Sequence, residues 1–535
     1  MEPNYKGLTS RWGATEEVLA AMRKQVAGFE HLVPVSALLV LSDPDEIWIK
    51  SSIDSVLQQV YPYVEVCVCI NGSKKPHVWE VLEGYAGDER IKVRHLPEKH
   101  GQAEAYNVAL SMVTGEVVAL LGQGDELSPD ALFRVVEFLQ HVRADVIYTD
   151  EDSIDVTGER LDPVFKLYWS PDLLLSTPYT GRLSVVRRKL LEAVGGFRQE
   201  LDGAEEHDLL LRLSEMTDRI YHLPGVLYHR RRLPWPDTPE KGQIQASLRA
   251  IEDALARRGE DSSVEPGPAQ GSFRVVRHVI GRPKVSVIVS APQGMAAVPI
   301  VDELKRRTSY PIHQLIVASD GPKVHRTADH VSDSFPARAL NLAARRAGGE
   351  YLVFVDGGLQ ITTPEWLAEL LSEAQRQSVG AVGCTLLNPD GILRQGGSLI
   401  EVGRLVGYED DSVLEDQAPL LVDHVFNFAA ASAGCMMVAK HVFDEMGGFD
   451  DEMLPTAFYD LDLSFRLQEK GLRNVYTPYA SLIHAGSELQ PGAEEIAYMW
   501  RRWWEQLVRL LYYRWSPLRA GYREISGEAS LLSAY

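Results

Sequence analysis

The sequence is poor in cysteine, and its few cysteines do not form a metal-binding pattern. Four of 535 residues are cysteine, Cys67, Cys69, Cys384 and Cys435, without the paired spacing of a zinc site. Cys67 and Cys69 lie inside an apolar, strand-like segment. Because disulfide frameworks belong to oxidising compartments, we expect buried, reduced thiols and a cytosolic protein.

Positive charge and long apolar runs are also scarce. The chain has 54 Lys and Arg against 75 Asp and Glu, a formal net charge of −21. This balance argues against nucleic-acid partners and against general adhesion to anionic membranes. No apolar run approaches the roughly 18 residues that span a bilayer. The start, Met1-Glu2-Pro3-Asn4, lacks the basic and apolar regions of a signal peptide.

The composition that is present is that of an ordinary globular protein, with 45% apolar and 24% charged residues. Buried-strand patterns at 35–41 and 64–70 alternate with helical patterns at 46–59 and 77–85, and a second series of strands begins at 285–289. Strands that alternate with helices of this length predict an α/β fold with a mainly parallel sheet in each half.

The same pattern divides the chain into four segments. We expect an N-terminal helical extension at 1–30, a first domain at 31–270, a second domain at 281–490 and a C-terminal helical tail at 491–535. A Gly-, Pro- and Ser-rich stretch at 261–272 is the expected linker.

The two halves repeat one another. An apolar strand with an abrupt polar end occurs at 115–125 and again at 349–358. Three further matches follow in the same order: Gly195-Gly196-Phe197 with Gly447-Gly448-Phe449, Glu206-His207-Asp208 with Asp460-Leu461-Asp462, and His229 with His484. Four matches in one order indicate a duplicated domain. Their unequal spacing predicts an insertion in the second copy, around residues 403–417.

Together these motifs resemble those of family 2 glycosyltransferases. The resemblance is carried by Tyr148-Thr149-Asp150-Glu151-Asp152, Trp169-Ser170-Pro171-Asp172, the Gly-Gly-Phe and acidic motifs of both halves, and Tyr476-Thr477-Pro478 leading to His484. It implies two tandem GT-A (nucleotide-diphospho-sugar transferase, Rossmann-like) domains with mainly parallel mixed sheets, of the kind found in bacterial surface-polysaccharide clusters. It also implies a nucleotide-sugar donor, with a UDP-sugar as the first candidate. The expected acceptor is a glycan or a lipid-linked molecule, and protein partners in assembly are expected as well.

The family's chemistry assigns roles in the second domain. A divalent cation, Mn²⁺ or Mg²⁺, neutralises the donor diphosphate and is held by an Asp-x-Asp pair and often a histidine. Here Asp356 and His484 match these ligands, but Gly358 replaces the second carboxylate. Asp460 matches the general base, with Asp462 beside it in the same acidic motif. Of the family's two acidic or amide positions near the nucleobase, the sequence keeps one, Asp320.

The first domain departs further from the family. Gly122-Gln123-Gly124 replaces the carboxylate pair and leaves Asp125 just beyond it, while Asn71 stands in the nucleotide pocket. Glu206 stands at the base position and His229 at the metal-side position. A glutamate carries its carboxylate roughly an angstrom further, and misplacement on that scale can cost ~10²-fold in rate. We therefore expect cation and catalysis in the second domain.

Each of these residues also has a purely structural interpretation. Carboxylates at helix starts stabilise the helix as caps, which stays open for Asp460, Asp462 and Glu206. Both histidines can be satisfied core residues, and Asp356 can cap a turn. Solvated loops are the corresponding interpretation for Glu151, Asp152 and residues 409–411.

The C-terminal segment is aromatic and basic, with Trp500, Trp503 and Trp504 close together. Such a helix can lie on a membrane surface, where lipid-linked acceptors reside. Alternatively its tryptophans pack it onto the second domain. Apolar residues nearly all round the helix favour packing.

Two classes of function remain open. One is an active glycosyltransferase, cytoplasmic or at the inner face of the membrane, with its active site in the second domain. The other is a catalytically inactive relative that serves as a glycan-binding or assembly subunit. The second is favoured by substitutions that cluster on the nucleotide and metal side of both domains. The first is favoured by Asp356, Asp460 and His484, which together are what a working site would retain, and by the catalytic character of the family, so we expect the enzyme.

Overall fold

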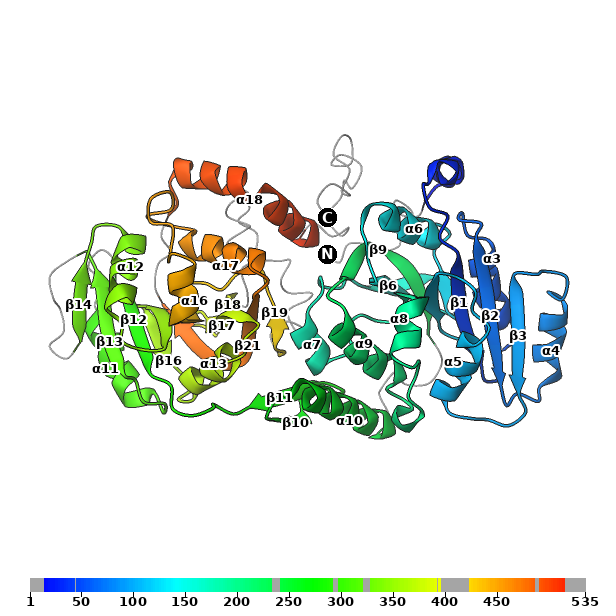
Figure 1. Ribbon diagram of the computed structural model, residues 1–535, viewed down its shortest axis with the longest axis horizontal. Coiled ribbons are helices and arrows are strands. Elements are labelled where there is room, and N and C mark those ends of the chain that lie inside the picture. Colours follow the sequence, from blue (N-terminus) through cyan, green and yellow to red (C-terminus); the bar gives the residue numbers. More distant parts are fainter. Residues whose placement is uncertain are drawn as a thin grey trace.

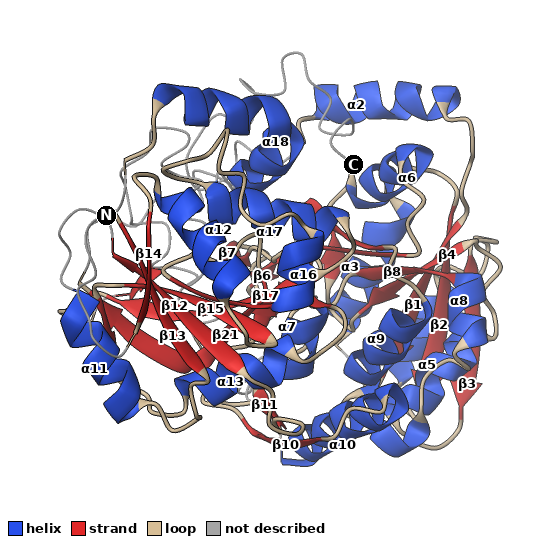
Figure 2. Ribbon diagram, turned by 60° about the vertical axis from the view of Figure 1, so that its left-hand side comes forward, coloured by secondary structure: helices blue, strands red, loops and turns tan. Residues whose placement is uncertain are grey.

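The computed structural model describes residues 14–43, 45–232, 241–291, 297–320, 328–391, 393–395, 423–485 and 490–514. Each half of the chain forms its own mixed sheet covered by helices, and the two halves lie side by side (Figures 1 and 2). Within the described residues no helix is both long and apolar enough to cross a membrane.

The first sheet has nine strands, in the order β3-β2-β1-β4-β8-β6-β9-β5, with β7 paired to β6. Its strands are β1 (Val35–Leu41), β2 (Val64–Asn71), β3 (Ile91–Leu96), β4 (Val117–Leu121), β5 (Glu126–Leu127), β6 (Val146–Ile154), β7 (Arg160–Val164), β8 (Ser184–Arg187) and β9 (Ile220–Arg231).

The second sheet has ten strands, in the order β14-β13-β12-β15-β20-β17-β21-β16, with β18 paired to β17 and β19 to β21. Its strands are β12 (Val285–Ala291), β13 (Gln314–Ser319), β14 (Asp329–Ser332), β15 (Tyr351–Asp356), β16 (Leu359–Ile361), β17 (Val379–Leu387), β18 (Leu393–Gln395), β19 (Phe426–Asn427), β20 (Cys435–Ala439) and β21 (Arg473–His484). The two orders correspond strand for strand, with β19 as an addition in the second sheet, so the duplication predicted from the sequence is a duplication of topology.

Helices cover both faces of each sheet. In the first half these are α2 (Glu16–Gln25), the short η1 (Val26–Gly28), α3 (Glu46–Leu57), α4 (Pro76–Glu83), α5 (Gln102–Leu110), α6 (Ala131–His141), α7 (Pro171–Ser176), α8 (Arg188–Ala193), the short η2 (Gln199–Leu201), α9 (Glu205–Met216) and α10 (Lys241–Arg258). In the second half they are α11 (Ala297–Arg307), α12 (Pro336–Arg346), α13 (Trp366–Ala374), α16 (Lys440–Glu445), α17 (Tyr459–Glu469) and α18 (Ala493–Arg514). Because helices lie on both sides, the central strands β1 and β12 are buried along their whole length.

The repeat extends to single hydrogen bonds. Asn107 on α5 brackets Phe197, accepting from its N–H at 2.9 Å and donating to its carbonyl at 2.7 Å. Asn341 on α12 does the same to Phe449, at 3.0 and 2.9 Å. These asparagines anchor the Gly-Gly-Phe turns to the helix that precedes β4 in the first half and β15 in the second, so the turns have a structural role in both halves.

A hairpin joins the two halves where a linker was expected. Strands β10 (Ser262–Pro266) and β11 (Phe273–Arg277) pair antiparallel, and in Figure 1 they lie beneath both domains beside α10. Arg277 of β11 is ion-paired with Glu373 of α13 at 3.1 Å, and the guanidinium of Arg274 lies 3.8 Å from the ring centre of Tyr479. The expected insertion around 403–417 lies outside the described residues.

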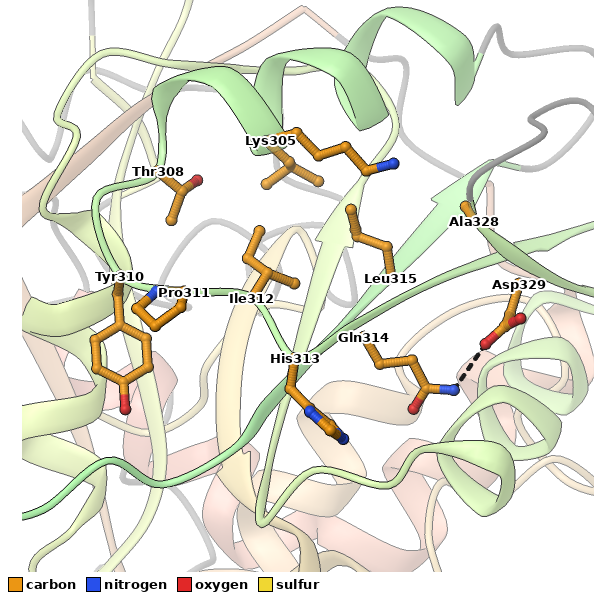
Figure 3. Close-up of a pocket in the computed structure, with 11 residues that line it drawn as sticks. Lys305, Thr308, Tyr310, Pro311, Ile312, His313, Gln314, Leu315, Ala328 and Asp329 are labelled. Atoms are coloured by element: carbon orange, nitrogen blue, oxygen red, sulfur yellow. Dashed lines mark hydrogen bonds between the residues drawn. The ribbon is translucent and has the colours of Figure 1, made fainter.

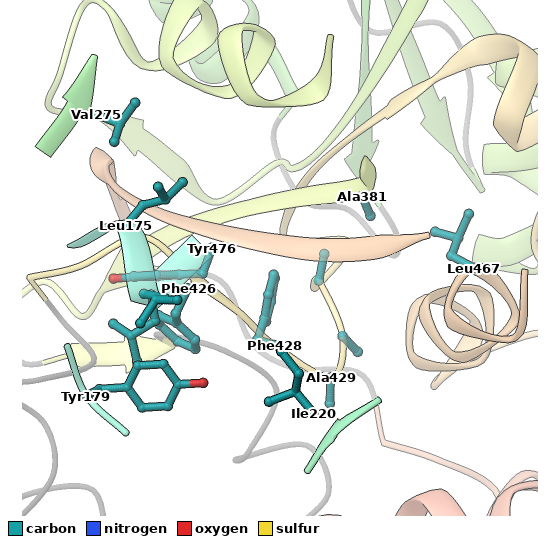
Figure 4. Packing of buried hydrophobic residues seen from close by; sticks show 14 of the residues in the cluster. Leu175, Tyr179, Ile220, Val275, Ala381, Phe426, Phe428, Ala429, Leu467 and Tyr476 are labelled. Carbon is teal, nitrogen blue, oxygen red and sulfur yellow. The ribbon is translucent and has the colours of Figure 1, made fainter. Parts of the chain in front are cut away.

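The domain interface combines a shared apolar core with a buried charge. Figure 4 shows Leu175 and Tyr179 of the first domain beside Phe426 and Tyr476 of the second, all in one buried cluster. At its edge Asp172 of α7 accepts hydrogen bonds from Arg376 Nη1 at 2.5 Å and Asn427 Nδ2 at 2.6 Å. Burial would raise the pKa of Asp172, but Arg376, Arg473 and Arg277 outweigh it and hold the pKa well below its usual range.

The C-terminal helix α18 packs on the second domain. Met499, Trp503 and Leu507 are buried, and the indole N–H of Trp503 donates to Asp462 at 2.9 Å. Trp504 keeps 60% of its surface exposed. All four cysteines are free and buried, as the sequence predicts.

We predict that Asp172→Ala uncouples the domains, because it leaves buried arginines without their partner. Breaking a buried ion pair costs about 3–5 kcal/mol. Calorimetry should show a lowered or split unfolding transition at neutral pH. Since the pKa of Asp172 is lowered in the folded state, its contribution to stability is present above pH ~4 and should disappear only in stronger acid.

The matched control is Asp253→Ala, which removes a surface ion pair with Arg198. The side chain of Asp253 is 49% exposed. The substitution should cost less than about 1 kcal/mol. Equal effects of the two substitutions would contradict the assigned role of Asp172.

Candidate active site

The ends of β15 and β21 bring Asp356 and His484 together. Pairing of β16 with β21 places His484 opposite Leu359, just beyond the turn that follows Asp356. His484 Nε2 lies 3.2 Å from Asp356 Oδ1, which also accepts the N–H of Gly358 at 2.7 Å. Both the turn-capping interpretation and the metal-ligand interpretation of Asp356 are compatible with this geometry.

Asp460 lies in the first turn of α17. The residue before the helix, Phe458, has a left-handed backbone with φ 62°, a conformation that costs about 1–3 kcal/mol and is often found at functional sites. Asp460 Oδ2 accepts from the N–H of Ala433 at 2.7 Å, and Oδ1 from the N–H of Leu461 at 2.9 Å. Burial raises the pKa of Asp460, while these hydrogen bonds oppose the rise.

One short segment connects the two acidic residues. The N–H of Ala433 binds Asp460, and the carbonyl of the next residue, Gly434, accepts the N–H of Asp356 at 2.9 Å. The carboxylate of Asp460 and the backbone N–H of Asp356 are therefore bound to adjacent residues just before β20, and His484 is linked to this stretch through the Asp356 side chain.

Asp462 lies in a different setting. Its carboxylate accepts from Arg466 Nε at 2.7 Å and from the Trp503 indole at 2.9 Å, and it is buried. These partners give Asp462 a structural role, in which it holds α17 to α18.

The two nucleotide-pocket residues occupy equivalent strand ends but differ in their contacts. Asp320 follows β13 and is exposed. Asn71 ends β2, and its side-chain amide accepts from the N–H of His100 at 2.8 Å and donates to its carbonyl at 3.0 Å. Asn71 is thus committed to holding the chain before α5.

In the first domain Asp125 fills the space of the missing carboxylate. A side chain begun at Gly122 would meet Asp125 Oδ2 at 2.1 Å. Asp125 Oδ2 accepts from the Tyr228 hydroxyl at 2.5 Å and Oδ1 from the N–H of Arg231 at 2.8 Å. The Asp125 side chain therefore points into the protein, and both of its oxygens accept hydrogen bonds from protein groups.

His229 is committed in the same way. It occupies the position of His484, since it faces β5 as His484 faces β16. Its Nδ1 lies 2.6 Å from Asp152, which also accepts from Arg160 at 2.5 Å. The solvated-loop interpretation of Glu151 and Asp152 is wrong, because both belong to β6, Asp152 is 1% exposed and Glu151 binds Lys166.

Glu206 faces the guanidinium of Arg182, a residue that the sequence motifs did not single out. Arg182 Nη1 lies 3.7 Å from Glu206 Oε1, with 42% and 24% of the two side chains exposed. Burial raises the pKa of Glu206 to about 7, against the opposing effect of Arg182. Arg182 stands as far before Gly195-Gly196 as Gly434 stands before Gly447-Gly448, so aligning the two halves upstream of these turns would have found it.

The residues of the second domain fit a divalent cation in part, and those of the first do not. Asp356 and His484 offer an oxygen and a nitrogen at one point, and the carboxylate oxygen is a donor type that suits Mn²⁺ and Mg²⁺. In the first domain Asp125 and His229 are both taken by protein partners. Among the described residues no three His, Cys, Asp or Glu side chains converge as a ready metal site.

A cavity of about 540 Å³ lies at the opposite end of the second sheet (Figure 3). It is formed where β13 and β14 begin, beside α11, and Gln314 donates to Asp329 across its edge at 2.8 Å. Asp356 ends the parallel strand β15, so this cavity is remote from the candidate site.

Comparison with known proteins agrees with this architecture. The model "Glycosyl transferase family 2" matches residues 46–195, and "Glycosyltransferase like family 2" matches residues 273–507. The chain belongs to glycosyltransferase family 2, with one copy of the domain in each half.

Two curated relatives match over most of the chain. O-antigen biosynthesis protein RfbC of Myxococcus xanthus is 35% identical over 88% of this chain and 39% of its own length. Uncharacterized protein y4gI of Sinorhizobium fredii is 32% identical over 93% of this chain and 59% of its own length. The chain thus spans about two fifths and three fifths of these relatives.

Among solved structures, S. aureus TarS 1–349 in complex with UDP-GlcNAc aligns with a TM-score of 0.35 and 21% identity. The alignment covers 42% of this chain and 66% of that one.

Proposed function

We propose that the chain transfers a sugar from a nucleotide-sugar donor to a glycan or lipid-linked acceptor in bacterial surface-polysaccharide assembly, with its active site in the second domain. Family membership supports the reaction class, and the name of the Myxococcus relative supports the assembly of an O-antigen-type glycan. The observation that carries the placement is the Ala433–Gly434 segment, which joins Asp460 on one side to Asp356 and His484 on the other.

Each residue then has a chemical task. Asp460 accepts the proton of the acceptor hydroxyl, and its raised pKa makes it a stronger base than an exposed aspartate. Asp356 and His484 hold a divalent cation, Mn²⁺ or Mg²⁺, which when bound neutralises charge on the donor diphosphate. Asp320, exposed at the end of β13, contacts the nucleoside of the donor, for which UDP is the first candidate.

Asp460→Asn tests the base. The amide keeps the shape but cannot accept a proton, so turnover should fall by about 10²–10⁴-fold with donor affinity nearly unchanged. Because the base must be ionised, wild-type turnover should fall on acidification at a pH above ~4, where an ordinary aspartate still works. Radiolabelled sugar transfer measures both.

The control for this test is Asp444→Asn on α16, an aspartate with 53% of its side chain exposed, which should retain full turnover. An Asp460→Asn enzyme as active as the wild type would contradict the role of Asp460. Loss of turnover in Glu206→Gln would instead move the chemistry to the first domain.

His484→Ala tests the cation site. It removes one of two protein ligands, so UDP binding that depends on Mn²⁺ should weaken at least about 10-fold in calorimetric titration. His229→Ala is the matched control at the equivalent strand end and should leave Mn²⁺-dependent binding unchanged. The assignment fails if the two histidine variants behave alike.

A second function is supported by the missing carboxylate at Gly358. With two protein ligands in place of three, the second domain would hold a cation weakly, as expected of a glycan-binding or assembly subunit that has lost catalysis. Absence of UDP binding at millimolar concentration, with and without Mn²⁺, would favour this function.

A further inference from the structure

The first domain carries a positively charged side chain, Arg182, near the position where the family's carboxylate pair is missing. Pairing of β4 with β8 sets Val117 opposite Arg187, and pairing of β15 with β20 sets Tyr351 opposite Ala439. Counting back along these equivalent strands puts Arg182 in the place of Gly434. Arg182 thus stands on the first-domain counterpart of the Ala433–Gly434 segment, which connects the acidic residues of the second domain.

The guanidinium of Arg182 interacts electrostatically with the carboxylates of Glu206 and Asp125. Glu206 at the base position and Asp125 just beyond the Asp-x-Asp position both raise the pKa of Arg182, Glu206 more strongly. Glu206 is its ion-pair partner among the described residues, at 3.7 Å, which is beyond hydrogen-bond distance. With 42% of its side chain exposed, Arg182 can turn its donors toward a ligand.

The two domains therefore show complementary patterns. The second has an aspartate–histidine pair and a glycine where the first has Arg182. The first has a guanidinium, while its histidine and aspartate are occupied by Asp152, Tyr228 and Arg231. A guanidinium neutralises phosphate as a metal ion does, and it adds directional hydrogen bonds.

We propose that the first domain binds a diphosphate group through Arg182 without a divalent cation. This inference deepens the proposed function, since it gives the chain a second, metal-independent anion site beside the metal-dependent one. The diphosphate can belong to a nucleotide or to a polyprenyl acceptor, because Arg182 recognises only the group that they share.

Glu206 is the resting counter-ion in this account. Its pKa of about 7 means that at neutral pH the carboxyl is neutral in about half of the molecules, which leaves Arg182 available. A bound anion disfavours the ionised carboxylate further, so binding should take up protons and should be tighter at pH 6 than at pH 8. The other groups that bear on Glu206 are Glu205, Asp125, Glu151 and Tyr106.

The test is calorimetric titration of the full chain in EDTA, in a His484→Ala background that silences the metal-dependent site. UDP, inorganic pyrophosphate and farnesyl diphosphate are the three probes. Arg182→Gln should weaken whichever probe binds by about 10- to 100-fold, the range for losing a hydrogen bond between charged groups. Glu206→Gln should strengthen it, because it removes the competing carboxylate.

The matched control is Arg188→Gln. Arg188 is 37% exposed and lies 3.7 Å from Glu192, almost the geometry of Arg182 and Glu206, but on the surface helix α8. Its affinity should equal that of the parent. Arg182→Lys, which keeps the charge, should bind between the parent and Arg182→Gln and guards against a folding defect.

No EDTA-resistant binding of any probe would overturn the proposal, as would binding that Arg182→Gln leaves intact or Glu206→Gln weakens. These outcomes are separate from failure of the proposed function, which is judged by Mn²⁺-dependent binding and turnover in the chain with His484 intact. The preferred probe identifies the source of the diphosphate.

Discussion

In both domains one partly buried arginine fixes where the acidic helix begins. Arg466 donates to Asp462 at 2.7 Å and to the carbonyls of Met446 and Gly448 at 2.7 and 2.8 Å. Arg212 repeats this with Asp208, Val194 and Gly196. The helix is thereby held to the Gly-Gly-Phe turn, whose glycines adopt positive φ at no steric cost. The position of Asp460, and of Glu206 in the first half, depends on this connection.

This constraint changes how the surviving motifs are understood. The Gly-Gly-Phe and acidic motifs persist in both halves, and their retention looked like retained chemistry. Asp462 is instead engaged by Arg466 and Trp503, and Asp208 by Arg198 and Arg212. Asn341 and Asn107 anchor the same turns. Loss of these contacts would leave buried charges and amides unpaired, so the motifs are required for folding whether or not a domain is catalytic.

Periodicity predicted the fold well because it is local. Apolar runs predicted strands at 35–41, 64–70 and 351–355, which the structure has within one residue, and repeated turns predicted the equivalence of the two halves. The site was less accessible, because side-chain commitments arise from tertiary packing. Nothing in the spacing shows that Asp125 folds into the space above Gly122, or that Asp152 lies buried in β6 against His229. Arg182 was missed because it belongs to no sequence motif. Its importance appears only when the two halves are aligned, which places it at the position equivalent to Gly434.

The central claim is that the Ala433–Gly434 segment unites a base and a cation site in the second domain. Hydrogen exchange measured by mass spectrometry tests it directly, in UDP with Mn²⁺ compared with UDP in EDTA. The account predicts that Mn²⁺ slows exchange in peptides that cover 351–361 and 429–439, where the amides of Gly358 and Ala433 bind Asp356 and Asp460. Exchange in both peptides that is the same with and without Mn²⁺ would contradict it.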